Sequence, residues 1–514
     1  MALNVVTALG TTAMEFITRH AAAIAVPATL ILALAVMTTI IPLLRRSQGK
    51  QPPSLSDTIP FVSNTYQYIL NLEAFLARAV SAWGLGGSTF SAGVQNIQLM
   101  LGQSNDIVSE PFMIMVFQNM WNFTPEDLAK FATDKSGRLQ HPRVESETVP
   151  DRQRYWHGVH HIYSEYMTKA RYSSRMADKY ADFFSTQLAA HSTLDEWTSV
   201  SLFGFVKQSM AHSAVAALLG PHVLGLNPGY VDKFWAFDDI VMYIPFHAAT
   251  GRYLDAALAH FDWDGPEAAS DWEEHFGSAQ GFMSLIVFAL NANTIPITTW
   301  ALYELVKDPA LFQEVRAEVL QAYIVDATTG ERKIDVQKLT ALPLLQSIYT
   351  ETLRVHMSLN LTREVNNTVV VEGYSLKKGA VLQAITQLAH LDEATWGREG
   401  HPASEFWAHR HLKHVPRLEK GEGGSVLELF MAGKSGSFVP FGGGPSICPG
   451  RVFAKQEILL TLVIVVARFD VEFVAWTKLD GSPLDRSARD DATYIGSAAV
   501  PPDRDMKLRW KRLW

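Results

Sequence analysis

Two long apolar stretches of the chain, each without a charged residue, predict helices. The first covers residues 21–44 and the second covers residues 282–303. As a helix, the first would be about 36 Å long, which exceeds the ~30 Å hydrocarbon core of a bilayer. Arg45 and Arg46 follow it directly, so the positive-inside bias predicts a membrane anchor with the C-terminal bulk in the cytosol. A cleaved signal peptide is the alternative, but its apolar region would be shorter, with the basic residues in front.

The second uncharged stretch is expected to form a helix inside a soluble domain. Asn293, Thr294 and Pro296 lie near its middle, where a lipid environment would make polar groups costly. Pro296 has no backbone N–H, and its ring clashes with the carbonyl of Ala292 four residues back. The sequence therefore predicts a core helix that is kinked at these polar residues.

Most of the remaining chain is predicted to be helical, with a small β portion. Residues 193–196 (TLDE) match a capping box and predict that a helix begins there. The Asp-Pro pair at 308–309 is expected to end the core helix. Residues 369–383 alternate and turn like a β-hairpin, and a final strand pair is expected within 494–510. The expected fold class is mainly α with a small β region.

Composition narrows the classes of function. The chain has 44 Lys and Arg against 52 Asp and Glu, a formal net charge of −8. A mildly acidic protein has no global basic surface for nucleic acid, so no nucleic-acid partner is expected. Cys448 is the only cysteine, which excludes an intramolecular disulfide and a zinc site built from several thiolates.

Cys448 lies in the segment FVPFGGGPSICPGR, between a glycine-rich turn and an apolar stretch that predicts a buried helix. A cysteine just before a helix meets unpaired N–H groups and the positive end of the helix dipole, which favour the thiolate. A thiolate here could attack a substrate or bind a metal. A nucleophile needs a nearby general base, and the local sequence offers none. Haem leaves one axial position for the protein and fits a single thiolate.

The segment FGGGPSICPG resembles the haem-binding loop of the cytochromes P450. Phe441, Gly444, Cys448 and Gly450 match the spacing of that loop. The resemblance implies the cytochrome P450 fold and a haem b cofactor whose iron takes Cys448 as its axial ligand.

A second motif of the same family lies upstream of the cysteine. The sequence ETLR supplies Glu351 and Arg354, and the later segment FWAHRHL supplies Arg410. In the family these three residues form a buried ion network. The resemblance implies that they support folding and haem retention rather than the reaction.

Two positions depart from the usual family pattern. Two residues before the cysteine, the family carries an Arg or His that pairs with a haem propionate, and this chain carries Ser446. The core helix has Ala292 and Asn293, followed by Thr294, where the family carries an acid and a Thr. Both departures resemble the branch of sterol 7α-hydroxylase and prostacyclin synthase. Asn293 and Thr294 are the candidate catalytic residues.

Other residues are expected to bind the haem propionates. Arg363, in LTREV, resembles a family residue that reaches one propionate. Trp156 and His160 have the spacing of the family's Trp–Arg pair, with His in place of Arg. Family placement also gives three candidate walls of the substrate pocket. They are residues 357–361, 290–294 and 494–498.

The resemblance implies a membrane-anchored monooxygenase that takes electrons from NADPH–cytochrome P450 reductase. The expected division is a short segment at 1–20, a single membrane span at 21–44, a proline-rich tether at 45–60, and one catalytic domain at 61–514 that faces the cytosol from the endoplasmic reticulum membrane. The expected substrate is a lipophilic terpenoid, steroid or polyketide of fungal secondary metabolism. The alternatives are a haem-thiolate isomerase or dehydratase of a lipid peroxide, and a non-catalytic haem sensor.

Overall fold

The computed structural model describes most of the chain after residue 96. The described residues are 97, 100–102, 105–121, 123–226, 229–241, 279–325, 327–328, 330, 332–371, 374–416, 425–434 and 436–514. The predicted anchor and tether lie outside them. The chain forms two compact units, of which the smaller includes residues 368–377 and the larger holds the other described residues. The described part of the smaller unit is a hairpin of β6 (Val369–Val371) and β7 (Tyr374–Leu376).

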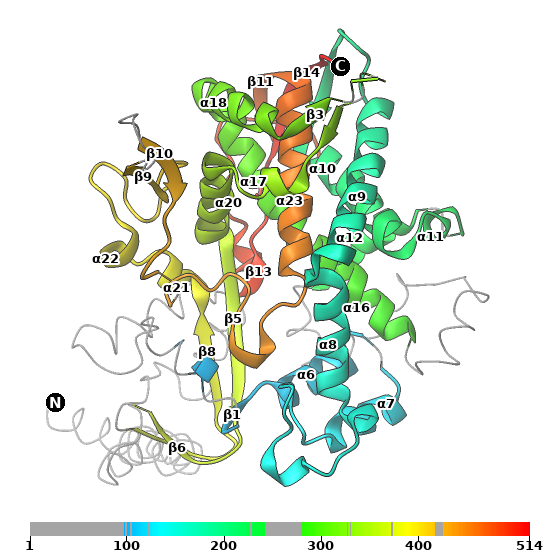
Figure 1. Cartoon of the computed structure of the whole chain (residues 1–514), viewed down its shortest axis with the longest axis vertical. Helices are drawn as coiled ribbons and strands as arrows, with labels where there is room; N and C mark the ends of the chain where they lie inside the picture. The colour runs from blue at the N-terminus through cyan, green and yellow to red at the C-terminus, as the bar shows by residue number, and fades with distance from the viewer. Residues whose placement is uncertain are drawn as a thin grey trace, which may run out of the picture. The chain divides into compact units, whose positions relative to one another are not determined.

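The larger unit is mainly helical. Its longer helices are α6 (Glu110–Asn119), α7 (Pro125–Thr133), α8 (Tyr155–Thr168), α9 (Ala170–Ala190), α10 (Leu202–Leu219), α12 (Tyr230–Val241), α16 (Ala279–Asn291), α17 (Thr294–Lys307), α18 (Pro309–Val319), α20 (Pro343–His356) and α23 (Arg451–Arg468). Short helices are α11 (His222–Leu226), α19 (Val336–Leu339), α21 (Thr386–His390) and α22 (Glu393–Trp396). Helix α23 lies between α20 and α9 and also packs on α17 and α18 (Figure 1). Their apolar side chains form the main core.

Two four-stranded sheets complete this unit. The first joins β1 (Ile107–Val108), β5 (Met357–Val365) and β13 (Ser497–Ala499), and β8 (Val381–Ile385) also pairs with β5. The second has the order β12 (Pro483–Leu484), β11 (Phe469–Thr477), β14 (Asp505–Arg512) and β2 (Trp197–Ser201). Two small hairpins are β3 (Tyr323–Val325) with β4 (Arg332–Ile334), and β9 (Leu412–Pro416) with β10 (Ser425–Leu429). The nine-residue strand β5 is central because it contacts β1, β8 and β13.

The predicted core helix and its kink are confirmed. The helix is divided into α16, which ends at Asn291, and α17, which begins at Thr294. The break falls at Ala292 and Asn293, where Pro296 removes the normal helical bonding. The segment Leu285–Lys307 is long and apolar enough to span a membrane, as is Leu202–Leu219, but 67% of the most apolar part of each is buried inside the protein. Both are therefore core helices of the larger unit.

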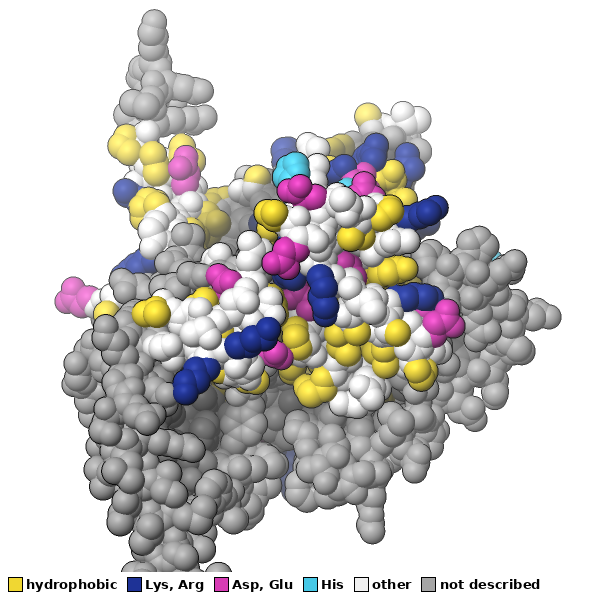
Figure 2. All heavy atoms as spheres, turned by 90° about the horizontal axis from the view of Figure 1, so that it is seen from below, with side chains coloured by type: hydrophobic (Ala, Val, Ile, Leu, Met, Phe, Trp, Pro, Cys, Tyr) yellow, Lys and Arg dark blue, Asp and Glu magenta, His cyan; other side chains and the backbone are white. Residues whose placement is uncertain are grey.

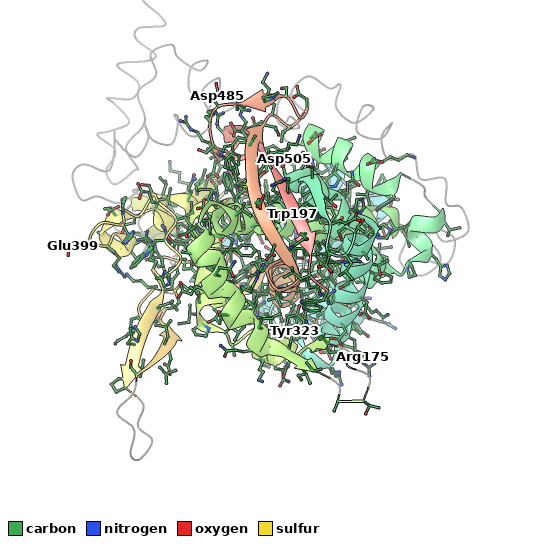
Figure 3. The ribbon with its side chains drawn as sticks, turned by 90° about the horizontal axis from the view of Figure 1, so that it is seen from above. Arg175, Trp197, Tyr323, Glu399, Asp485 and Asp505 are labelled. Carbon is green, nitrogen blue, oxygen red and sulfur yellow. The ribbon has the colours of Figure 1, made fainter. Side chains whose placement is uncertain are left out.

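The prediction that TLDE opens a helix was wrong. Residues 197–201 instead form β2, which pairs with β14, and the helix α10 begins at Leu202. The carboxylate of Asp505, on β14, accepts hydrogen bonds from the N–H groups of Phe203 (2.8 Å) and Gly204 (3.0 Å) and caps α10 from a distant part of the sequence. Figure 3 shows Asp505 and Trp197 on these neighbouring strands. Strand pairing outweighed the local capping signal.

The predicted β elements were right in part. The hairpin expected at 369–383 is confirmed for β6 and β7, but its last residues belong to β8, which pairs with β5. The two strands expected at 494–510 exist but do not pair with each other. Strand β13 pairs with β5, whereas β14 pairs with β11 and β2.

The surface seen from below in Figure 2 mixes side chains of every type. Over the residues that are described there, basic, acidic and hydrophobic side chains are interspersed (Figure 2). Because opposite charges alternate at short spacing, their fields largely cancel at distances beyond the ~8 Å Debye length of physiological salt. This described area therefore has no broad patch of one charge sign.

Candidate functional site

The cysteine loop is fixed by its own backbone. The N–H of Cys448 donates to the carbonyl of Phe441 at 3.0 Å, and the N–H of Ile447 donates to the carbonyl of Gly444 at 3.2 Å. The guanidinium of Arg451, the first residue of α23, donates to the carbonyl of Cys448 at 2.9 Å. These bonds hold the thiol directly before α23, as the sequence predicts. Phe441 contributes its carbonyl, and its ring packs against the main core.

Glycine is needed at Gly444 for two reasons. Its φ of +62° lies in the left-handed region, where a side chain causes strain. A Cβ at this position would also lie 2.5 Å from the carbonyl oxygen of Leu101. Gly450 differs, because a Cβ there would meet Met167 Sδ at 3.6 Å and Cys448 Sγ at 3.8 Å, which are ordinary contacts. Nothing in the local packing requires glycine at Gly450.

The thiol of Cys448 does not have the lowered pKa that its place before a helix predicts. Burial raises the pKa of the Cys448 thiol, and the N–H groups of Gly450 and Arg451 and the charge of Arg451 oppose this rise without overcoming it. A coordinated metal deprotonates a thiol outright, so a bound iron would stabilise the thiolate here. Among the described residues, no group of three or more His, Cys, Asp or Glu side chains could hold a metal. The single thiol of Cys448 fits haem, which needs one protein thiolate.

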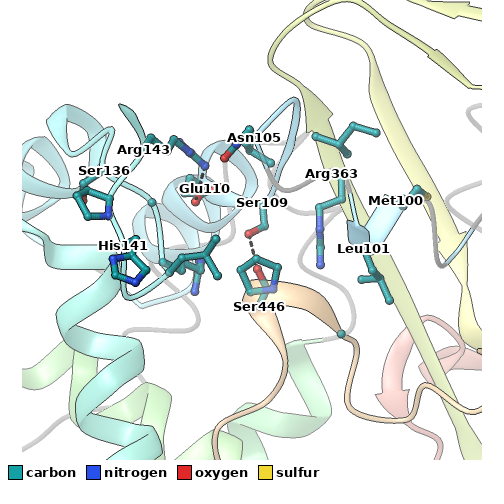
Figure 4. A pocket seen from close by; sticks show the side chains of 18 of the residues that line it. Met100, Leu101, Asn105, Ser109, Glu110, Ser136, His141, Arg143, Arg363 and Ser446 are labelled. Carbon is teal, nitrogen blue, oxygen red and sulfur yellow. Dashed lines mark hydrogen bonds and ion pairs between the residues drawn. The ribbon is translucent and has the colours of Figure 1, made fainter. Parts of the chain in front are cut away.

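A cavity of about 230 Å³ lies beside the cysteine loop (Figure 4). Arg363 projects into it from β5, and Ser446 borders it from the loop. The hydroxyl of Ser446 is hydrogen-bonded to the hydroxyl of Ser109 at 2.9 Å. Glu110 and Arg143 form an ion pair of 3.3 Å at the cavity wall. A basic residue in a cavity beside the cysteine loop fits a cofactor that carries carboxylates.

Trp156 and His160, expected to bind propionates, lie in different surroundings. The indole N–H of Trp156 donates to the carbonyl of Phe131 at 3.0 Å. Since indole has no other donor, the structure does not bring a free Trp156 N–H to the cavity. His160 lies against the cysteine loop, with its Nε2 atom 3.2 Å from the carbonyl oxygen of Ile447.

The break in the core helix, within the predicted pocket wall 290–294, contacts β13 at the residue directly after the predicted wall 494–498. The side-chain oxygen of Asn293 accepts a hydrogen bond from the N–H of Ala499, on β13, at 3.1 Å. The hydroxyl of Thr294 donates to the carbonyl of Leu290 at 2.6 Å within its own helix. Ala498, next to this contact, has a φ of +132°, which is strained for a residue with a side chain. Asn293 therefore ties the helix break to β13.

The structure brings Glu351, Arg354 and Arg410 together in one buried network. Arg354 donates twice to the Glu351 carboxylate, at 2.8 Å each, and Arg410 donates once at 2.7 Å. All three side chains are fully buried. Both arginines also donate to backbone carbonyls of the segment between β8 and β9. The network thus ties α20 to that segment, which includes α21 and α22.

His411 is a fourth member of this network that the sequence reasoning missed. Its Nε2 atom is 2.9 Å from the Glu351 carboxylate. Burial alone would raise the pKa of Glu351, but the hydrogen bonds from Arg354 and His411 lower it to about 2. Burial lowers the pKa of His411 despite that carboxylate. The available signal was its place directly after Arg410 in the segment FWAHRHL.

We expect His411→Phe to destabilise the protein without changing its haem spectrum. The substitution removes a hydrogen bond to a buried carboxylate, which is worth about 1.5–3 kcal/mol. The measurement is urea-dependent unfolding of the purified holoprotein. His409→Phe is the matched control, because His409 contacts Glu314 at 3.2 Å but is much more exposed. Equal effects of the two substitutions would contradict the role given to His411.

Comparisons with known proteins agree with this site. The sequence model of the family "Cytochrome P450" matches residues 281–482. The cytochrome P450 monooxygenase calL of Penicillium decumbens is 41% identical over 91% of this chain and 94% of its own length. The cytochrome P450 monooxygenase fsoE of Humicola fuscoatra is 26% identical over 90% of this chain and 88% of its own. Cytochrome P450 7A1 of Rattus norvegicus is 32% identical over 44% of each chain.

The similarity to calL extends over nearly the whole of both sequences, and the segment that matches the family model, residues 281–482, includes the cysteine loop and the buried network described above. The expected sterol 7α-hydroxylase branch also appears, as a partial match. The chain belongs to the cytochrome P450 family of haem-thiolate monooxygenases, in which a single cysteine, here Cys448, ligates the haem iron.

Proposed function

We propose that this monooxygenase oxidises a lipophilic terpenoid, steroid or polyketide in fungal secondary metabolism. The observation that supports this proposal is the 41% identity to a monooxygenase of a Penicillium species over almost the full chain. We further propose that residues 21–44 anchor the protein once in the endoplasmic reticulum membrane, with 1–20 before it and 45–60 as a tether. Residues 61–514 then form one catalytic domain in the cytosol, which receives electrons from NADPH–cytochrome P450 reductase.

The residues of the chain have separate tasks in this proposal. Haem, when bound, supplies the iron at which molecular oxygen is activated, with electron density from a thiolate. Cys448 provides that thiolate, held by the hydrogen bond from its N–H to Phe441. Arg363 offers a positive charge to the haem carboxylates from β5. At the junction of α16 and α17, the side chains of Asn291 and Thr294 are buried, away from bulk water.

Asn293 and Thr294 are assigned to positioning rather than to acid catalysis. An amide is no acid, and the oxygen of Asn293 already accepts the N–H of Ala499, which leaves its NH2 group as a donor to water or substrate. The Thr294 hydroxyl donates to Leu290, so its oxygen is free to act as an acceptor. Protons must then reach the reaction through ordered water, which these two groups can orient.

We expect Asn293→Ala to lower the yield of product per NADPH consumed by about tenfold, the effect of losing one to two hydrogen bonds. Because β13 loses its tie to the helix break, the position of oxidation should also change. Both are measured by NADPH oxidation and mass spectrometry of the products. Thr298→Val is the control, since it removes a buried hydroxyl one turn later that donates to the carbonyl of Thr294 within the same helix. Unchanged coupling in Asn293→Ala would contradict this assignment.

The function is tested by producing the full chain in microsomes with a reductase and feeding it candidate lipids. Oxygenated products that require both NADPH and the reductase are the expected result. Turnover of a lipid peroxide without NADPH would instead support the isomerase or dehydratase alternative. Haem binding with no turnover under either condition would support the sensor alternative.

A further inference from the structure

Arg138 is a second largely buried arginine on the cavity beside the cysteine loop. It lies between α7 and α8 and lines the same cavity as Arg363. Its guanidinium carbon is 4.7 Å from the centre of the Trp156 ring. Its Nε atom is buried and has no hydrogen-bond partner among the described residues. A buried donor without an acceptor is costly, so this group is arranged for an acceptor that the described side chains do not supply.

Arg138 and Arg363 share an unbalanced electrostatic environment. Burial lowers the pKa of both guanidinium groups, and the charge of Glu110 opposes this in both. The charge of Arg363 lowers the pKa of Arg138 further. Within the described part of the chain, neither arginine has a carboxylate at ion-pair distance, and the nearby Glu110 pairs with Arg143. Arg363 donates to the backbone carbonyl of Thr362 at 2.9 Å. Two desolvated cations facing one cavity need an anion to offset their burial.

The other residues expected to hold haem carboxylates contribute little charge. Ser446 is neutral, and its hydroxyl is bonded to Ser109. Burial lowers the pKa of His160, and the charges of Arg138 and Arg451 lower it further against the effect of the Ile447 carbonyl. His160 is therefore expected to be neutral near pH 7. Arg138 is the residue placed to restore the missing charge.

We propose that Arg138 and Arg363 together bind the two propionate carboxylates of haem, with Arg138 supplying the charge that Ser446 and His160 do not carry. The planar guanidinium group suits a carboxylate, to which it can donate two parallel hydrogen bonds. The stacking of Arg138 on Trp156 holds that plane in place without using any of its N–H donors. The inference depends on the haem cofactor and not on the substrate or the reductase.

The test compares holoproteins that carry Arg138→Gln, Arg138→Lys and Arg152→Gln. Haem transfer to excess apomyoglobin is followed by absorbance. Loss of a charged hydrogen bond predicts that Arg138→Gln releases haem about tenfold to hundredfold faster. Arg138→Lys should release it at an intermediate rate, because the charge remains but the two-donor geometry is lost. Arg152 is exposed, on a short helix of the same segment (Asp151–Gln153), and its variant should match the wild type.

A second measurement separates propionate binding from mere support of Trp156. The propionate-bending bands of the resonance Raman spectrum should shift in Arg138→Gln and Arg138→Lys, while the carbon monoxide difference band stays thiolate-type. If Arg138→Gln retains no haem, the Raman bands of Arg138→Lys decide. Unshifted propionate bands with wild-type haem release, whatever the effect on thermal unfolding, would overturn the proposal.

Discussion

Replacing Cys448 by serine is expected to abolish the thiolate-type carbon monoxide difference band and all monooxygenase activity. A serine hydroxyl stays protonated where a metal-bound thiol ionises, so it cannot give iron the same electron density. No other cysteine in the chain can replace it. The measurements are the reduced carbon monoxide spectrum and the haem content per polypeptide.

Ser446→Ala is the control for this substitution. It alters the same loop two residues earlier and removes only the hydrogen bond to Ser109. We expect its carbon monoxide band to be unchanged. A thiolate-type band that survives in Cys448→Ser would show that the ligand assignment is wrong.

The second large effect is expected for Glu351→Gln, which should prevent accumulation of folded holoprotein. The amide leaves Arg354 and Arg410 buried without the charge that they surround. Breaking a buried ion pair from one side costs about 3–5 kcal/mol, a large part of the roughly 5–15 kcal/mol that stabilises a typical domain. Soluble yield, haem content and unfolding by urea measure the effect. Glu314→Gln is the control, because Glu314 pairs with His409 at a half-exposed site.

The same carboxylate makes the stability of the protein depend on acid pH. The pKa of Glu351 is about 2 in the folded protein against 4.5 ordinarily, so the folded state favours the charged form. This stabilisation is fully present above about pH 4.5 and is lost as the pH falls towards 2. The difference corresponds to about 3 kcal/mol. A free energy of unfolding of the wild type that stayed constant between about pH 4.5 and pH 2 would contradict the network's role.

The features that the sequence predicted well depend on local chemistry. Pro296 breaks the core helix because of its own ring and missing N–H, and the break falls at Ala292 and Asn293 as expected. The order of the glycine-rich turn, Cys448 and the following helix is likewise set within a few residues. These signals need no knowledge of distant segments. Gly444 is explained in this way only in part, because its positive φ belongs to the local turn but the close approach of Leu101 does not.

The features that the sequence missed depend on contacts between distant segments. The capping box predicted at residues 193–196 does not start a helix, because the residues after it pair as β2 with β14. Helix α10 is instead capped by Asp505 of β14, which is 301 or more positions away in the sequence. The indole of Trp156 was expected at a propionate but donates to Phe131. Arg138 lies in no motif of the sequence, and His411, although it follows Arg410 directly, joins the network through what surrounds it in space. Burial also reverses the expected direction of the Cys448 pKa, and burial cannot be read from neighbours in sequence.

Strand β5 couples two properties that are usually altered separately. At one end, Met357, Ser358 and Leu359, which belong to the predicted pocket wall 357–361, pair with β13, whose first two residues belong to the predicted wall 494–498. Near the other end, the same strand carries Arg363 into the cavity beside the cysteine loop. Because a strand transmits a shift in register along its whole length, substitutions that adapt this wall to a new substrate can also lower the affinity for the prosthetic group. Variant libraries at these residues should be screened for retention of the prosthetic group before they are assayed for new products.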